Sequence, residues 1–326
     1  MSPCPSTFLS SPDGLITICH IITITEVPFH ILGAYCILAK TPEKMKNVKI
    51  SLLNLHFLTV FFDLTMGFLC IPFILLPTFS GVPVGLLTSW KVPVAVQIYI
   101  GSTAIAVTGI AVLAVFENRY YRLFNDLQWK KYRIYYLLFN YFLAFTFFSY
   151  PFSQIPEQDY GRKVVLESLP CSPDLPSTPI FVFSLDTNIP ICLITFMLIT
   201  IVSQIVFLFV ITIRRLVIKY QHLSVNTYQI QQKFMKAIFM QFLITLGFFA
   251  APIVYLCYSV ITEVFEQGIN NLCFITLTLY GLLSTIIMIT IHQPYREWVF
   301  QCFKVKKVNN SHQISSRNSV HSVCNL

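Results

Sequence analysis

Residues 93–116 have the sequence PVAVQIYIGSTAIAVTGIAVLAVF, which contains no charged side chain. A helix needs roughly 20 mostly apolar residues to cross the ~30 Å hydrocarbon core of a bilayer, so this stretch predicts a membrane-spanning helix. Six other stretches of this kind lie on either side of it. The seven predicted spans are 15–38, 50–79, 93–116, 134–152, 189–213, 234–260 and 270–291. The sequence therefore predicts an all-α membrane protein in which residues 15–291 form one seven-transmembrane helix bundle.

The positive charges are concentrated in alternate gaps between these spans. Nineteen of the 22 Lys and Arg residues lie in the gaps before the second, fourth and sixth spans, at the start of the sixth span (Lys236) or in the C-terminal tail. Short loops rich in Lys and Arg stay in the cytosol. We therefore expect the N-terminus (1–14) outside the cell and the C-terminus in the cytosol. The net charge of +8 then reflects basic residues that face anionic lipids rather than a nucleic-acid partner.

Composition agrees with a membrane domain. Hydrophobic residues make up 55% of the chain and charged residues 11%, with a mean hydropathy of +0.68, far from an ordinary soluble domain. Residues 1–14 contain no Lys or Arg, so the basic start of a cleaved signal peptide is missing. The first apolar stretch is predicted to be a retained transmembrane helix with a short extracellular N-terminus.

The longest predicted outer loop, about 153–188, is acidic and rich in proline. We expect an irregular segment, and two roles stay open for it: covering a ligand entrance or connecting two spans. It carries Cys171, which would lie in an oxidising compartment. Either this thiol is free or it forms a disulfide with Cys4 or Cys273.

Several ionisable groups are predicted to lie at membrane depth. Asp63 is near the middle of the second span, and Glu26 and His30 are near the middle of the first. A charged residue costs about 2.5–3.5 kcal/mol at a helix centre, so these side chains should face the bundle interior. Asp63, grouped with Asn54, predicts either a polar site that holds water or an ion, or a buried acid satisfied by neighbouring helices. Both interpretations stay open for Glu26 and His30 as well.

Four prolines lie inside the predicted spans and each predicts a bend, because proline removes a backbone hydrogen bond. They are Pro28, Pro72, Pro77 and Pro252. Pro252 predicts either a pivot in the sixth helix or a static kink.

Two stretches resemble rhodopsin-like receptors. Residues 53–64, LNLHFLTVFFDL, followed by Ile71-Pro72-Phe73, are similar to the second helix of that superfamily. Glu117-Asn118-Arg119-Tyr120 directly follows the third span, where the superfamily carries an acid-Arg-aromatic motif; here Asn118 intervenes. The chain departs from the superfamily at Ala250, which replaces an aromatic residue, and in lacking the Asn-Pro-x-x-Tyr run of the last helix.

The closer resemblance is to the nematode serpentine chemoreceptors, specifically serpentine receptor class H. The order and spacing of a set of short motifs carry it over about nine-tenths of the chain. The motifs are Pro28-Phe29-His30, Lys40-Thr41-Pro42-Glu43-Lys44-Met45, Leu55-His56 with Asp63, Phe116-Glu117-Asn118-Arg119, Leu169-Pro170-Cys171 and Pro294-Tyr295-Arg296.

This resemblance implies a G-protein-coupled chemosensory receptor that detects a small environmental molecule and activates a heterotrimeric G protein. It also implies the plasma membrane, with sensory cilia of chemosensory neurons as the expected location. The residues expected to form the coupling switch are Glu117, Asn118, Arg119, Arg214, Arg215, Pro294, Tyr295 and Arg296.

The ligand pocket should lie among the outer halves of the helices, beneath the acidic loop, and should be apolar and aromatic. Gln97, Tyr99 and Tyr255 are its candidate lining residues, chosen from their outer-half positions. No cofactor or metal is expected.

The C-terminal region predicts a short interfacial helix over 292–308, since it mixes apolar, aromatic and basic residues. Cys302 is a candidate palmitoylation site. Residues 309–326 predict a disordered cytosolic tail, whose serines could recruit an arrestin-like regulator on phosphorylation or could simply be solvated.

Other classes fit less well. No nucleophile elbow, phosphate loop or metal-ligand cluster indicates an enzyme, and residues 270–291 have no Lys for a retinal Schiff base. No repeated half indicates a transporter. The strongest rival is a seven-helix ligand-gated cation channel of the insect odorant-receptor kind, whose N-terminus is cytosolic.

The charge pattern generates a direct test. Epitope tags at the two ends, stained before and after permeabilisation of expressing cells, should show an accessible N-terminus and a protected C-terminus, because the basic gaps hold their loops in the cytosol. A protected N-terminus would contradict the receptor interpretation and favour the channel.

Overall fold

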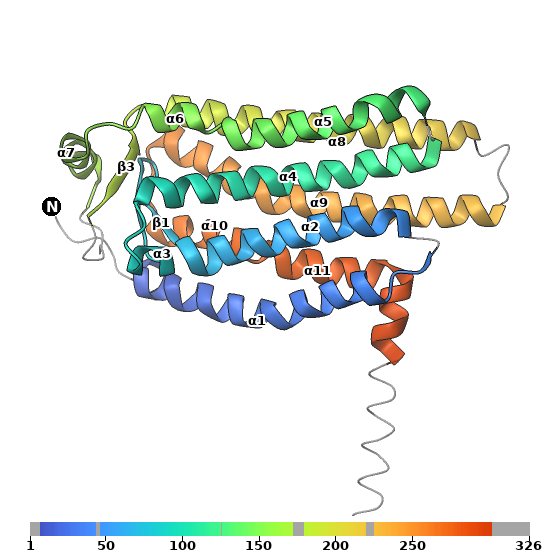
Figure 1. The fold of residues 1–326 in the computed structure, drawn as a ribbon. Coiled ribbons are helices and arrows are strands. Elements are labelled where there is room, and N and C mark those ends of the chain that lie inside the picture. The colour runs from blue at the N-terminus through green and yellow to red at the C-terminus, as the bar shows by residue number, and fades with distance from the viewer. Residues whose placement is uncertain (1–6, 44–45, 125, 172–178, 220–224, 302–326) are drawn as a thin grey trace, which may run out of the picture.

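The computed structural model describes residues 7–43, 46–124, 126–171, 179–219 and 225–301. Long helices run side by side and a small sheet closes one end of the bundle (Figure 1). The long helices are α1 (Pro12–Ala39), α2 (Lys46–Leu64), α4 (Val94–Phe124), α5 (Leu127–Thr146), α8 (Asn188–Lys219) and α9 (Val225–Thr262). The last pass consists of α10 (Gln267–Thr278) and α11 (Tyr280–Ile291).

Six of the described helices are long and apolar enough to cross a membrane. They are Pro12–Ala39, Val48–Cys70, Val94–Phe124, Asn188–Ile218, Phe242–Thr262 and Gln267–Ile291. The seventh helix of the bundle is α5, whose first turns carry three basic residues and whose later turns expose Leu138, Phe139 and Phe142. Exposed apolar side chains of this kind suit a lipid-facing surface. The predicted seven-helix bundle is confirmed.

Helix α4 is the centre of the bundle, packed against α2, α5 and α8. Small side chains let neighbouring helices approach closely in a membrane, and α4 supplies Ala104, Ala106 and Ala111 to the buried interior. Because α4 is buried on most of its surface, the residues at its two ends are well placed to form interior sites.

The end of the second span differs from the prediction. A helix over 50–79 is wrong: α2 continues only through a π-helical segment, Thr65–Cys70 (η3), and Ile71 then adopts φ 40° and ends the helix. Pro72 and Pro77 therefore do not bend a helix. Pro28 and Pro252 do lie inside helices, α1 and α9 respectively.

The residues after Ile71 form a sheet that the all-α prediction lacked. Strands β1 (Pro72–Ile74), β2 (Phe79–Pro83) and β3 (Phe181–Ser184) pair antiparallel in the order β1-β2-β3. Gly81 permits the close approach of β1 and β2, since a Cβ there would lie 2.4 Å from the Phe73 carbonyl oxygen. The sheet sits at one end of the bundle (Figure 1), which we call the sheet end.

The long loop is more regular than expected. Within the described residues it contains α7 (Gln158–Ser168) as well as β3. The Gln158 amide donates to the Val182 carbonyl and accepts from the Val182 backbone N–H, both at 3.0 Å, and Arg162 Nε donates to the Ile180 carbonyl at 2.7 Å. These bonds fasten α7 to β3, so the prediction of an irregular loop is wrong for this part.

Other boundaries shift as well. The predicted span 134–152 corresponds to α5, which begins at Leu127 and ends at Thr146, and a separate short helix α6 (Ser149–Ser153) follows. The predicted span 270–291 is interrupted at Leu279 between α10 and α11. Shorter elements are η1 (Phe8–Ser10) and α3 (Leu86–Ser89).

The opposite end of the bundle collects the C-terminal end of α4, the start of α5 and the end of α11 (Figure 1). Arg119, Arg133, Arg215 and Arg296 belong to these segments or to the adjoining end of α8, and we call it the basic end. Residues 293–301 are helical and run across the bundle axis there (Figure 1). The rest of the predicted interfacial helix, Cys302 and the tail 309–326 lie outside the described residues.

Candidate functional site

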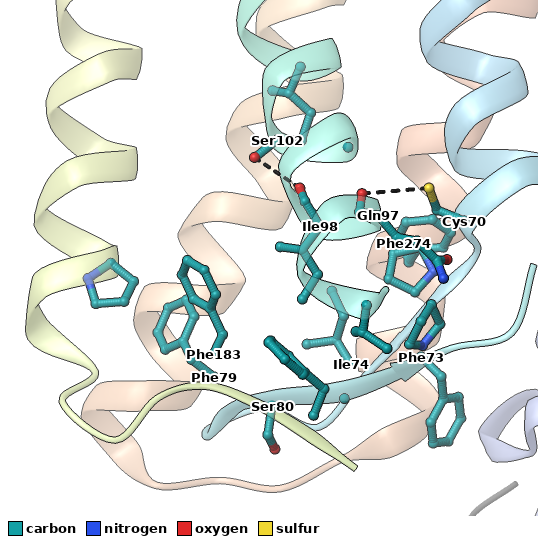
Figure 2. A pocket seen from close by; sticks show the side chains of 18 of the residues that line it. Cys70, Phe73, Ile74, Phe79, Ser80, Gln97, Ile98, Ser102, Phe183 and Phe274 are labelled. Carbon is teal, nitrogen blue, oxygen red and sulfur yellow. Dashed lines mark hydrogen bonds between the residues drawn. The ribbon is translucent and has the colours of Figure 1, made fainter. Parts of the chain in front are cut away.

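A cavity of about 240 Å³ lies at the sheet end, inside the bundle. Helix α4 forms one wall and the three strands cover it (Figure 2). Segments far apart in the chain contribute the rest: η3, α6, α8 and α10. Six phenylalanines line it: Phe73, Phe79, Phe148, Phe181, Phe183 and Phe274.

The few polar groups of the lining are already hydrogen-bonded within the protein. Ser102 donates to the Ile98 carbonyl at 2.9 Å, and the Cys70 thiol faces the Gln97 carbonyl at 3.6 Å (Figure 2). The Gln97 side chain donates to the Val92 carbonyl at 2.9 Å. A ligand that needs hydrogen bonds would find these groups occupied, so the cavity suits a small apolar molecule.

The structure places one of the three predicted pocket residues at the cavity and the other two elsewhere. Gln97 lines the cavity. Tyr99 points away, because its hydroxyl donates to the Phe145 carbonyl and its ring packs against Phe152 at 5.3 Å. Tyr255 on α9 is not among the lining residues.

Sequence reasoning missed the strand contribution to the cavity. Phe181 and Phe183 line it from β3, and their spacing of two residues is the signature of side chains on one face of a strand. The alternation in residues 181–184 could have predicted a short strand. It could not have shown which helices the strand packs against, because the segment is too short.

At the basic end, Glu117 is fully buried and held by two donors from α5. Trp129 Nε1 donates to Glu117 Oε1, and Arg133 Nη2 donates to Glu117 Oε2, both at 2.8 Å. The Arg133 guanidinium also lies 4.1 Å from the centre of the Tyr121 ring and reaches the Asn118 side-chain oxygen at 3.4 Å. The acid of the Glu-Asn-Arg motif is thus paired with Arg133, which sequence reasoning did not single out.

Arg119 points into the bundle and is 9% exposed. His292, which directly follows α11, is buried near it. Burial lowers the pKa of His292, and the Arg119 charge lowers it further, to about 4. A neutral imidazole therefore lies near the Arg119 guanidinium at physiological pH. The structure thus brings Arg119 of α4 close to His292, which follows the last helix.

Arg215 of α8 reaches the loop between α4 and α5. Its guanidinium lies 3.5 Å from Asp126 and 5.1 Å from the centre of the Tyr120 ring. Asp126 begins α5 by accepting the Trp129 and Gln128 amides, and the first of these bonds is the main reason that its pKa is lowered. Arg214, by contrast, is exposed.

The Pro294-Tyr295-Arg296 motif joins the last helix to α1. Tyr295 is completely buried and its hydroxyl is 2.8 Å from the Thr41 hydroxyl. Arg296 donates to the Thr290 carbonyl at 3.1 Å, and Pro294 is half-buried. Tyr295 is thus a packing anchor in this structure.

Asp63 and Asn54 do not form one site. Asn54 donates to the Tyr141 hydroxyl at 2.8 Å and so links α2 to α5. Asp63 is 1% exposed and lies 3.2 Å from His30 instead.

A family model described as "Serpentine type 7TM GPCR chemoreceptor Srh" matches residues 10–305. The chain belongs to this family. It is also 28% identical over 307 residues to Serpentine receptor class H-72 of Caenorhabditis elegans, covering 92% of this chain and 88% of that protein. The resemblance seen in the motifs is confirmed.

As a member of the Srh family, the chain is a multi-pass membrane protein of the chemosensory, GPCR-like receptor type and not an enzyme. Cys171 of this Srh receptor is disulfide-bonded, while Cys273 carries a free thiol. Cys4, the other candidate partner, lies outside the described residues.

The buried Glu117–Arg133 pair generates a stability prediction. Arg133→Met should leave the Glu117 carboxylate buried without its cation and cost about 3 kcal/mol, or roughly 6–12 °C in melting temperature. The purified receptor's melting temperature measures this.

Lys130→Met, one turn earlier and exposed, is the matched control and should leave the melting temperature unchanged. Adding Glu117→Gln to Arg133→Met should recover part of the loss, because the buried charge is then removed. Equal melting temperatures for Arg133→Met and Lys130→Met would contradict the pairing.

Proposed function

We propose that this Srh receptor binds a small apolar molecule in the sheet-end cavity and transmits the signal to a heterotrimeric G protein at its basic end. The observation that carries the proposal is the cavity itself, whose lining is aromatic and aliphatic and whose polar groups are already paired. Family membership supports the receptor function, and the lining of the cavity supports an apolar ligand.

The ligand class follows from the lining. Phe79 and Phe183 offer ring faces, while Ile98, Ile105 and Leu193 offer aliphatic surface. Burial of apolar surface stabilises a bound molecule by about 25 cal/mol per Å², and no charged side chain is among the lining residues. A volume of about 240 Å³ selects a small odorant-like compound rather than a peptide.

The orientation supports this arrangement. The positive-inside rule assigns the basic end to the cytosol, so the sheet end would face the exterior, where an environmental molecule arrives. We propose that the receptor lies in the plasma membrane, in the sensory cilia of chemosensory neurons. An arrestin-like regulator acting on the C-terminal tail completes the proposal.

Coupling is proposed to use the buried polar groups around the end of α4. A basic surface attracts the acidic segments of a partner, and Arg119, next to His292 of the last helix, lies where two moving helices would meet. Exposed Arg214 and half-buried Arg215 lie on the neighbouring end of α8.

The cavity can be filled by a single substitution. Gly101 lines it, and a Cβ there would lie 3.1 Å from the flexible end of Met66. Gly101→Leu should therefore occupy ligand space and raise the activating concentration about 5- to 150-fold, which corresponds to 1–3 kcal/mol for overpacking. The measurement is an odorant panel on cells that express the receptor with a promiscuous Gα and a calcium reporter.

Gly247→Leu is the matched control, because a Cβ at exposed Gly247 meets nothing within 4 Å. It adds the same side chain to a helix away from the cavity and should keep normal potency. If the two variants have equal potency at equal surface expression, the activating ligand does not bind in this cavity.

A substitution at Arg119 tests the proposed G-protein coupling separately from ligand binding. Arg119→Ala should retain surface expression and ligand binding but lose the calcium signal, because it removes the buried cation beside the last helix. Lys163→Ala, an exposed change at the sheet end, is the control and should signal normally. Full-strength signalling by Arg119→Ala would show that the proposed switching role is wrong.

A further inference from the structure

Three ionisable side chains meet in the middle of the bundle, away from the sheet-end cavity. Glu26 and His30 lie one turn apart on α1, and Asp63 faces them from α2. The two acids are each 1% exposed and His30 is 6% exposed. One ligand atom from each side chain lies within 4.8 Å of the other two, and His30 Nε2 is 3.2 Å from Asp63 Oδ2.

The backbone N–H groups of Gly281 and Leu282 approach the Asp63 and Glu26 carboxylates, but most of the cluster's ligand atoms still lack a well-aligned hydrogen bond within the described residues. Both Asp63 carboxylate oxygens, Glu26 Oε1 and His30 Nε2 are buried and unpaired. The His30–Asp63 contact is an ion pair only when the imidazole is protonated. A neighbouring hydroxyl, Thr23 Oγ1, one turn before Glu26, is unpaired as well. Unsatisfied buried polar atoms are costly, and five in one place indicate a missing partner.

The orientation of His30 favours a ligand at Nε2. Its other ring nitrogen, Nδ1, is 3.5 Å from the Thr285 hydroxyl of α11. If Nδ1 carries the proton and donates to Thr285, Nε2 presents a lone pair to the Asp63 carboxylate. Two lone pairs that face each other at 3.2 Å repel unless a proton or a metal cation lies between them.

The surrounding helices leave room for this arrangement. A Cβ at Gly281, the second residue of α11, would lie 1.4 Å from Asp63 Oδ2, so only glycine lets the carboxylate occupy that position. The π-helical segment η3 begins two residues after Asp63, and such turns often occur at functional sites. Three helices thus converge on one group of unpaired atoms.

We propose that Glu26, His30 and Asp63 bind a divalent transition-metal cation of the Zn²⁺ type. Two carboxylates and a neutral imidazole carry a charge of −2, which one divalent ion neutralises inside the membrane. Tetrahedral Zn²⁺ with ligands at 2.0–2.1 Å places them about 3.3 Å apart, close to the 3.2 Å between Nε2 and Oδ2. A water molecule would complete the fourth position.

The donor set distinguishes this ion from others. Imidazole nitrogen together with carboxylate oxygen suits Zn²⁺ and its neighbours, whereas Ca²⁺ takes six to eight oxygen ligands and Mg²⁺ prefers oxygen and water. The bound ion would join α1 to α2 and, through Thr285 and Gly281, hold both against α11. The site is independent of the ligand cavity and of G-protein coupling.

Zinc binding by the purified, metal-stripped receptor without a histidine tag tests the proposal. A titration against a chromophoric zinc chelator should give one equivalent of tight binding per chain, and zinc X-ray absorption should show nitrogen and oxygen ligands without sulfur. The second measurement excludes binding by free cysteines. His30→Asn should weaken the affinity at least about 100-fold, and Thr285→Ala about tenfold, the range seen when a residue that orients a ligand is lost.

His20→Asn is the matched control: it changes the same residue type on α1, but His20 packs beside Phe68 at 5.6 Å and belongs to no such cluster. It should retain the wild-type affinity. The proposal is overturned if the wild-type receptor binds no stoichiometric zinc, if sulfur ligands appear, or if His30→Asn binds as tightly as His20→Asn. Thermal stabilisation of the receptor by Na⁺ but not by Zn²⁺ would also overturn the proposal. So would a melting temperature that changes with pH but not with added Zn²⁺.

Discussion

Backbone and side-chain polar groups in the hydrocarbon of a bilayer must find partners within the protein, because lipid tails offer none. The arrangement of this Srh receptor follows from that constraint. Its membrane-depth segments are helical, and its strands are confined to one end, where β1, β2 and β3 satisfy one another. Fully buried Glu117 persists because Trp129 and Arg133 donate to both of its oxygens. The same rule makes the unpaired atoms of Glu26, His30 and Asp63 conspicuous.

The same constraint gives the two ends of the bundle different chemistry. At the sheet end, hydrogen bonds inside the protein occupy the polar groups of the cavity lining and leave apolar surface for a ligand. At the basic end, α4, α5, α8 and the last helix meet through charged and aromatic side chains such as Arg119, Arg133 and Arg215. Because α4 runs from the cavity to Arg119, a ligand that repositions α4 would alter the packing at both ends. Central α4 is thus the element through which binding and coupling are most directly linked.

Much of the architecture could be predicted from the sequence, because hydropathy over 20 residues depends only on local composition. The motif Glu117-Asn118-Arg119 was recognised from its resemblance to an acid-Arg-aromatic motif and its place after an apolar span, which are also local features. What could not be predicted depends on long-range packing. Nothing local shows that Arg133 pairs with Glu117, that Phe183 covers a cavity lined by Ile98, or that Gly281 admits the Asp63 carboxylate. The end of α2 was missed because residues 71–79 are as apolar as a span, although Pro72 and Gly81 suit a hairpin better than a helix.

The central claim is that the sheet-end cavity receives the ligand. A cryo-electron-microscopy structure of the receptor with an activating odorant tests it most directly. The account predicts ligand density between α4 and the sheet, in contact with Ile98, Phe79 and Phe183. Density at another site, with the cavity between α4 and the sheet left empty, would contradict it.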